Sequence, residues 1–238
     1  MDKPLLFQNQ RQQKSSMNIR RSVKIPRARG PEAKEERRKN IVQAASLIFA
    51  QLGYAATEMD RVALELGLSK GTIYLYFENK EALFLHCVDQ GMRDLNESVR
   101  EAMTLAADPM EKIVLAFRAY FQFLDEHPQQ IELLIQERAN FKDRKTQTYF
   151  EHRANNRAFW KGIYQTLIKT GRIVVPMQLD QFLDLIGTLL YGTMFTQRYD
   201  TRASTLSERT SHLLEFVFQG VLSQGEQKVW METLKRIE

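Results

Sequence analysis

The chain has 238 residues, of which 43% are hydrophobic and 26% charged, a composition typical of a soluble globular protein with one or two domains. No apolar run approaches the roughly 18 residues of a membrane-spanning helix, residues 1–30 lack the apolar core of a signal peptide, and the one cysteine, Cys87, has no intrachain disulfide partner. These features argue against a membrane or exported protein and favour a cytoplasmic one.

The positive charge is concentrated at one end of the chain. Residues 1–39 hold 12 Lys and Arg against 4 Asp and Glu, whereas the whole chain has a net charge of only +5. Residues 1–30 are also polar and without periodicity, which predicts a disordered basic arm. Two interpretations of this arm stay open: it contacts a polyanion such as DNA, or it only solubilises the chain.

The first elements expected along the chain are helices. A 3.6-residue apolar pattern from Ile41 to Leu52 ends at Gly53, which predicts a helix with a glycine stop. A second helix is expected over residues 57–66, with Thr57 and Asp60 forming a cap at its start.

Residues 67–80 carry conflicting signals. The centre of this segment, from Thr72 to Phe77, is rich in β-branched and aromatic side chains, which favours a strand. However, Ser69 and Asn79 are good helix caps, and Ile73 shares one helical face with Phe77. A lone strand in a helical chain would leave its backbone groups unpaired, so we predict a helix over 70–77 and, with the helix before it, a helix-turn-helix.

The rest of the chain also carries helical signals. Asp108-Pro109 and His127-Pro128 mark helix starts, Gly171 ends a helix that starts near Lys145, and apolar helical patterns cover 178–199 and 206–222. The predicted fold class is therefore all-α, with a small N-terminal unit and a larger C-terminal helical body.

The residues around the predicted helix-turn-helix resemble a known signature. Residues 67–83 (GLSKGTIYLYFENKEAL), with Thr57, Val62 and Ala63 before them, closely resemble the N-terminal signature of the TetR (tetracycline repressor) family of transcriptional regulators. The resemblance covers about residues 35–85, and beyond it the chain is similar to the family only in length and helical character. It implies three parts: the basic arm (1–30), a three-helix DNA-binding domain (31–80), and a domain for effector binding and dimerisation (81–238).

The resemblance implies that the chain binds an inverted-repeat DNA operator as a homodimer, and that it is not an enzyme. Thr57 and Ser69 are expected to cap helices whose N-terminal N–H groups can bind a phosphate. The resemblance implies that six further positions contact DNA: Lys70, Gly71, Thr72, Tyr74, Tyr76 and Lys80. Two alternatives stay open: Leu75 contacts a thymine methyl group or faces solvent, and Tyr76 contacts DNA or packs on the next helix.

The C-terminal body is expected to hold an unknown small-molecule effector. The candidate effector-binding residues mix large apolar surfaces with a few polar groups: Tyr120, Arg138, Phe141, His152, Asn156, Trp160 and Tyr164. Such a stripe is also typical of an ordinary core, and the polar run at 151–157 is the part that most favours a site.

The last two long helices are expected to form the dimer interface. The candidate residues form one stripe on each helix: Leu183, Gly187, Leu190, Tyr191 and Met194 on the first, and Phe216, Val217 and Gly220 on the second. These stripes could equally be intramolecular core.

Two other functions compete with a ligand-controlled regulator, most simply a repressor. One is a nucleoid-type protein that binds DNA without sequence preference, and the other is an all-α enzyme. Against an enzyme, the sequence has no nucleophile elbow, no His-Glu-x-x-His motif and no phosphate-binding loop. The four histidines are scattered, so neither a metal nor a cofactor is expected.

Overall fold

The computed structural model of the chain describes residues 30–196, 205–219, 222 and 225–226, and within these ranges it contains helices and one isolated β-bridge. The predicted all-α fold is confirmed. The helices are α1 (Pro31–Leu52), α2 (Met59–Glu65), α3 (Lys70–Tyr74), α4 (Lys80–Met103), α5 (Pro109–Glu126), α6 (Pro128–Asn140), α7 (Thr148–Lys169), α8 (Leu179–Thr196) and α9 (Leu206–Gln219).

The ends of α1, α3 and α4 are set by local hydrogen bonds that the sequence predicts. Gly53 follows α1 with a positive φ of 84°, and its N–H donates to the Phe49 carbonyl. The Ser69 hydroxyl accepts from the Thr72 N–H, and the Asn79 amide oxygen accepts from the Ala82 N–H at 2.8 Å. Helix α3 ends at Tyr74, earlier than the predicted end at residue 77, and the chain continues as a turn in which the N–H groups of Tyr76 and Phe77 donate to the Ile73 carbonyl. The strand propensity of residues 72–77 is overridden, because the capped helix and this turn satisfy the backbone groups.

The start of α2 differs from the prediction. The helix begins at Met59, with Glu58 at its N-cap position and no side-chain cap. Thr57 is instead fully buried, and its hydroxyl donates to the Gly53 carbonyl at 2.8 Å. The predicted cap is wrong because this hydroxyl has an acceptor in the preceding turn, four residues earlier.

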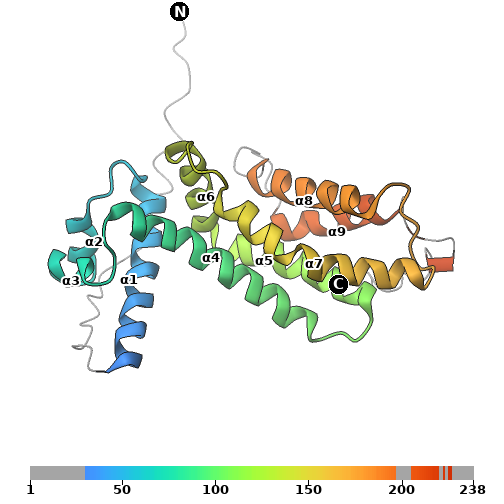
Figure 1. Ribbon diagram of the computed structural model, residues 1–238, viewed down its shortest axis with the longest axis horizontal. Helices are drawn as coiled ribbons and strands as arrows, with labels where there is room; N and C mark the ends of the chain where they lie inside the picture. The colour runs from blue at the N-terminus through green and yellow to red at the C-terminus, as the bar shows by residue number, and fades with distance from the viewer. Residues whose placement is uncertain (1–29, 197–204, 220–221, 223–224, 227–238) are drawn as a thin grey trace, which may run out of the picture.

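Helix α4 belongs to both halves of the molecule (Figure 1). Its first turn lies beside the unit formed by α1, α2 and α3, and the rest of its 24 residues runs into the body. Along this length it packs against α1, α5, α6 and α7. A movement of the body relative to the first three helices must therefore involve α4 or its contacts.

The body is built around α5, which packs against α4 on one side and α9 on another. Asp108 caps α5 by accepting from the N–H groups of Met110 and Glu111, as the sequence predicts. Helices α7 and α8 pack on each other, and Ile173 of the connection between them forms an isolated antiparallel bridge with Leu222.

A buried carboxylate on α6 bonds to residues at and just before the start of α7. The Glu137 side chain is 1% exposed and accepts from the backbone N–H and the hydroxyl of Thr148 and from the guanidinium of Arg144. Arg144 also contacts Glu151, which is 46% exposed, so one arginine pairs with a buried and an exposed carboxylate.

We predict that Glu137→Ala lowers the free energy of unfolding by about 3–5 kcal/mol, because it leaves Arg144 and the Thr148 N–H without their buried partner. The matched control Glu151→Ala, which removes the exposed partner of the same arginine, should cost less than about 1 kcal/mol. Urea denaturation of the two variants measures both values. Equal losses would mean that Glu137 does not fasten α6 to α7.

Candidate functional site

Two buried side chains decide which face of α3 is exposed. Ile73 and Phe77 are buried in the core together with Phe49 of α1, Val62 of α2 and Leu83 of α4. This confirms the predicted core role of the pair. Because the two lie at positions i and i+4, the side chains on the opposite side of the segment are turned to solvent.

The exposed face of α3 carries polar and apolar groups together. Tyr74 is 43% exposed, and Leu75 is 77% exposed, the highest value for a large apolar residue in the helix-turn-helix. Thr72 is half-buried, with its hydroxyl 2.8 Å from that of Ser69. Tyr76 is half-buried and packs against the core, which agrees with the alternative to a DNA contact.

Lys70 and Asp60 form an exposed ion pair across the turn. The ammonium group of Lys70 donates to Asp60 Oδ2 at 2.8 Å, and this hydrogen bond raises the pKa of Lys70, so the side chain stays charged at neutral pH. Gly71 is exposed beside it, with nothing but the Ser69 hydroxyl near the position of a Cβ atom. The first turn of α3 therefore presents a cation and accessible backbone.

Lys80 is already engaged within the chain. Its ammonium group donates to the carbonyls of Tyr54 at 3.0 Å and Ala55 at 3.3 Å, and lies 4.6 Å from the centroid of the Tyr54 ring. Tyr54 in turn packs edge-on against Phe84 and Phe141. Lys80 thus holds the loop after α1 against α4, a structural role that the sequence analysis missed.

One predicted DNA-binding position, Thr57, is corrected, and the predicted basic arm is not described by the structure. Thr57 is fully buried, so it cannot contact a ligand on the surface. The basic arm, residues 1–30, lies outside the described residues except for Gly30.

A cavity of about 140 Å³ lies in the body between α4, α5, α7 and α8. Its walls are mainly apolar, and most of its polar groups come from α4 and α7. The residues that line it include Leu95, Asn96, Phe117, Tyr120, Tyr149, His152, Arg153, Asn156, Arg157, Trp160, Tyr164, Leu183, Gly187 and Leu190.

Of the seven predicted effector-binding residues, five line this cavity: Tyr120, His152, Asn156, Trp160 and Tyr164. The other two lie elsewhere. Phe141 packs on Tyr54 and Phe84 at the junction with α1, and Arg138 is exposed, with its guanidinium donating to the Tyr191 hydroxyl. Both predictions are wrong because helical periodicity does not show which neighbouring helix a side chain faces.

The cavity also holds buried phenol groups. Burial raises the pKa of Tyr120, Tyr149 and Tyr164 above the ordinary value of tyrosine. All three are therefore neutral at physiological pH and able to donate a hydrogen bond. Tyr120 donates to the Met194 sulfur at 3.8 Å.

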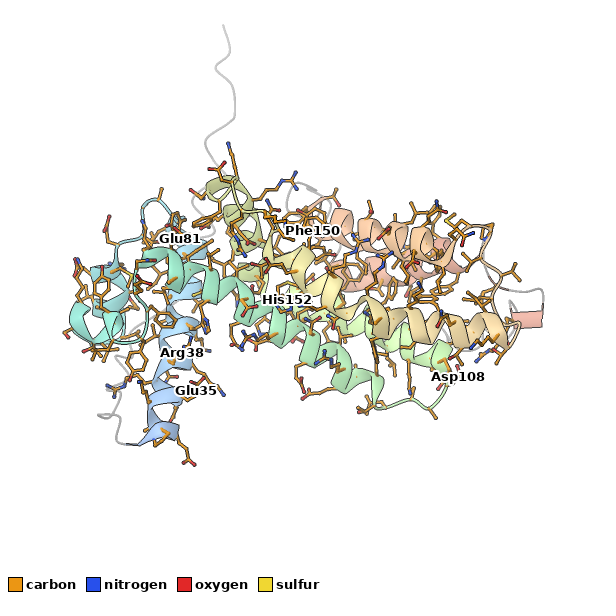
Figure 2. All side chains as sticks on the ribbon, viewed as in Figure 1. Glu35, Arg38, Glu81, Asp108, Phe150 and His152 are labelled. Atoms are coloured by element: carbon orange, nitrogen blue, oxygen red, sulfur yellow. The ribbon has the colours of Figure 1, made fainter. Side chains whose placement is uncertain are left out.

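A chain of hydrogen bonds joins α7 to α4 at one edge of the cavity. His152, which Figure 2 labels on α7 where it crosses α4, has Nε2 2.7 Å from Asp89 Oδ1. The Asn96 amide donates to His152 Nδ1 at 2.9 Å and accepts from the Asn156 amide at 2.9 Å. Since Nδ1 accepts, Nε2 carries the hydrogen that is donated to Asp89.

At the other edge of the cavity, ion pairs join α7 to α8. Arg153 donates to Asp184, Arg157 donates to both Asp180 and Asp184, and Lys161 donates to Asp180, at distances of 2.6–3.3 Å. The two carboxylates have lowered pKa values, chiefly because Lys161 bonds to Asp180 and Arg157 to Asp184. The polar run at 151–157 pointed to this region, but its acidic partners on α8 were missed.

Several residues predicted for a dimer interface are internal. Met194 is fully buried, Leu183 is buried, and Leu183, Gly187 and Leu190 line the cavity. Their assignment to a dimer interface is corrected, because the apolar stripe of α8 is used within the protomer. Tyr191 packs between Tyr149 and Phe150, Val217 is buried, and Gly220 lies outside the described residues.

Helices α8 and α9 each also carry an exposed apolar side chain. Phe216 of α9 is largely exposed and Leu185 of α8 about half exposed, while Leu189 and Leu213 are partly buried. Of the predicted interface positions, Phe216 is the one with a large exposed side chain. A partner surface could cover these side chains without displacing the core.

Other kinds of site find little support in the described part of the chain. Cys87 is fully buried, and burial raises the pKa of its thiol to about 12, which makes it unreactive. Among the described residues, no cluster of three or more histidine, cysteine or acidic side chains is placed to bind a metal. Within the same residues, no helix is both long and apolar enough to span a membrane.

Comparison with known proteins agrees with this geometry. Residues 41–87 match the profile of the family described as bacterial regulatory proteins, tetR family. Over 117 residues the chain is 31% identical to the HTH-type transcriptional activator FasR of Mycolicibacterium smegmatis, which covers 49% of this chain and 50% of FasR. The chain spans about half the length of the curated relatives it matches.

Solved structures resemble the chain over a greater length. FadR of Bacillus subtilis, solved in complex with stearoyl-CoA, has a TM-score of 0.66 and 24% identity over 75% of this chain and 96% of its own. The fatty acid degradation regulator FadR of Bacillus halodurans also has a TM-score of 0.66, with 18% identity over 79% of this chain and 95% of its own. These likenesses show the fold alone. The match over residues 41–87, which include the helix-turn-helix, shows that this part of the chain is similar to the tetR family of bacterial regulatory proteins.

Proposed function

We propose that this protein is a cytoplasmic transcriptional regulator, most simply a repressor, that binds an inverted-repeat operator as a homodimer and is not an enzyme. In this proposal residues 31–80 bind DNA, residues 81–238 bind the effector and dimerise, and the basic arm (1–30) adds salt-sensitive affinity. The observation that carries it is the exposed face of α3, where Lys70, Tyr74 and Leu75 stand away from the buried pair Ile73 and Phe77.

The DNA contacts follow from the groups that this face offers. Lys70, with the backbone around Gly71, suits phosphate oxygens, and the Tyr74 hydroxyl has the reach to do the same. Thr72 and Leu75 present methyl groups, which match the C5-methyl group of thymine in the major groove. One such helix reads few bases, so a dimer with its two α3 helices one DNA turn apart is expected, and the exposed apolar side chain of Phe216 supports one.

The effector is proposed to occupy the cavity between α4, α5, α7 and α8. Its apolar walls with polar groups on α7 suit a small amphipathic molecule. The stearoyl-CoA bound by Bacillus subtilis FadR is one such molecule, which supports this class of effector here. An effector changes DNA affinity only if it binds one arrangement of α4 and α7 better than another.

Selection of bound duplexes from a random pool by the full-length chain tests the proposed function. A regulator enriches an inverted repeat, whose half-sites then define the operator. A protein that binds DNA without preference enriches no sequence, and an enzyme without DNA affinity retains none. Either of the last two results contradicts the proposal.

We predict that Leu75 contacts a thymine methyl group in each half-site. Replacing the contacted thymine by uracil removes only that methyl group, and should weaken binding about fourfold, the effect of about 0.8 kcal/mol for one buried methylene-sized group. In Leu75→Ala this sensitivity to uracil should disappear. The control Leu64→Ala alters a leucine of α2 that is 72% exposed, and should keep the sensitivity of the wild type. A uracil effect that survives in Leu75→Ala would assign the methyl contact to another residue.

We predict different roles for the two lysines of this unit. Lys70→Met should leave the denaturation midpoint unchanged, but should lower the slope of log K against log salt by about 1.8, the value of one phosphate contact from each protomer of the dimer. Lys80→Met should lower stability by about 1–2 kcal/mol, because it removes two hydrogen bonds and a cation–π contact within the chain. Urea denaturation and salt titration of DNA binding measure the two effects. A stable Lys80→Met protein would show that Lys80 does not hold the loop.

A further inference from the structure

The ion pairs between α7 and α8 stand at the surface and also border the cavity. Three cations on α7, Arg153, Arg157 and Lys161, pair with two carboxylates on α8, Asp180 and Asp184. This group of side chains therefore has one more positive charge than negative. Asp184 is 57% exposed and Arg157 34% exposed, so water reaches both.

Two of the three cations line the cavity itself. Arg153 and Arg157 are among its lining residues, whereas Lys161 is not. Gly187 of α8 makes room for one of them: a Cβ atom built there would lie 2.4 Å from Arg153 Cζ and 2.5 Å from its Nε. Any side chain at position 187 would thus push this guanidinium from its place at the cavity wall.

The cavity is too small for a ligand of ordinary size, so such a ligand fits only if one wall moves. A volume of about 140 Å³ is similar to that of an engineered cavity that holds one benzene molecule, and is below the roughly 300–1,000 Å³ of ordinary ligand pockets. The edge between α7 and α4 is held by the partly buried chain of His152, Asn96 and Asn156. The edge between α7 and α8 is held by exposed ion pairs, which stabilise least, so it opens more easily.

We propose that the edge between α7 and α8 is the portal of the cavity, and that the effector is an apolar molecule with one anionic head group, a carboxylate or a phosphate, which replaces Asp184 on Arg153 and Arg157. This inference rests on the proposed function, in which an effector binds in the cavity. It adds the head group of that effector and the edge through which it enters.

The exchange is balanced in charge and hydrogen bonding. The incoming anion takes over the donors of Arg153 and Arg157, and the Asp184 carboxylate, already more than half exposed, is released into water. Guanidinium groups suit carboxylates and phosphates equally well. The apolar part of the molecule then displaces solvent along Leu95, Phe117 and Leu183.

Binding of four dodecyl compounds to the full-length wild-type protein tests this chemistry. Dodecanoate has a carboxylate head group and dodecyl phosphate has a phosphate head group. Dodecanoyl-CoA tests whether the anion is part of a CoA thioester, and 1-dodecanol is the neutral control. Below their micellar concentrations, calorimetry should give dodecanoate or dodecyl phosphate an affinity about tenfold above that of dodecanol. If only dodecanoyl-CoA binds more tightly than dodecanol, the anion that is recognised is a phosphate of the CoA group. The proposed anionic head group then stands.

Three variants should change that ratio in different directions, and a fourth is the matched control. Arg157→Gln removes a donor and should abolish the preference for the anion, and Gly187→Ala should reduce it by displacing Arg153 without changing any charge. Asp184→Asn removes the competing carboxylate and should strengthen dodecanoate binding severalfold. Lys161→Gln removes the same charge as Arg157→Gln beside the cavity and should leave the preference intact. Circular dichroism checks that each variant is folded.

If none of the three anionic compounds binds more tightly than dodecanol to the wild type, or if the preferred anion binds more weakly to Asp184→Asn, the proposal is overturned. If no dodecyl compound binds while the random-pool selection enriches an inverted repeat, the portal and ligand class are wrong and the regulator stands. If the anion binds as expected while no sequence is enriched, the regulator is wrong and the binding site stands.

Discussion

The burial of Ile73 and Phe77 against α1, α2 and α4 is the constraint on which the DNA-binding unit depends. Because both side chains must be inside, Lys70, Tyr74 and Leu75 are turned outward on a segment of only about two turns. The same core includes Leu83 and Phe84 at the start of α4, so the orientation of α3 is tied to the orientation of α4. Whatever moves the first turn of α4 therefore moves the proposed DNA-reading surface.

Helix α7 is the part of the body best placed to move α4. It covers the cavity and is joined to α4 by His152 on one edge and to α8 by Arg153 and Arg157 on the other. A ligand that opens the edge with α8 while the bond from His152 to Asp89 is kept would pull on α4. Coupling of about 1–3 kcal/mol is enough to change DNA affinity five- to 150-fold, so a small displacement suffices.

The sequence predicts well what depends on nearby residues. The caps at Ser69, Asn79 and Asp108 are correct because each side chain bonds to the backbone two or three residues later. Thr57 fails because its hydroxyl reaches an earlier carbonyl.

Long-range packing accounts for the other errors of the sequence analysis. The apolar stripe of α8 is compatible with a dimer interface and with intramolecular core, because a helical pattern indicates which face is buried and not which chain covers it. Arg138 and Phe141 do not line the cavity, because periodicity does not show which helix a side chain faces. The ion pairs of Arg157 with Asp180 and Asp184 join residues 23 and 27 positions apart, which no local pattern predicts.

Photocrosslinking of the protein to a selected operator, with 5-iodouracil in place of the contacted thymine, tests the outward face of α3. The crosslinked peptide should contain residues 70–77, with Tyr74 or Leu75 as the modified position. A crosslink confined to the body, between α5 and α9, would contradict this orientation of α3.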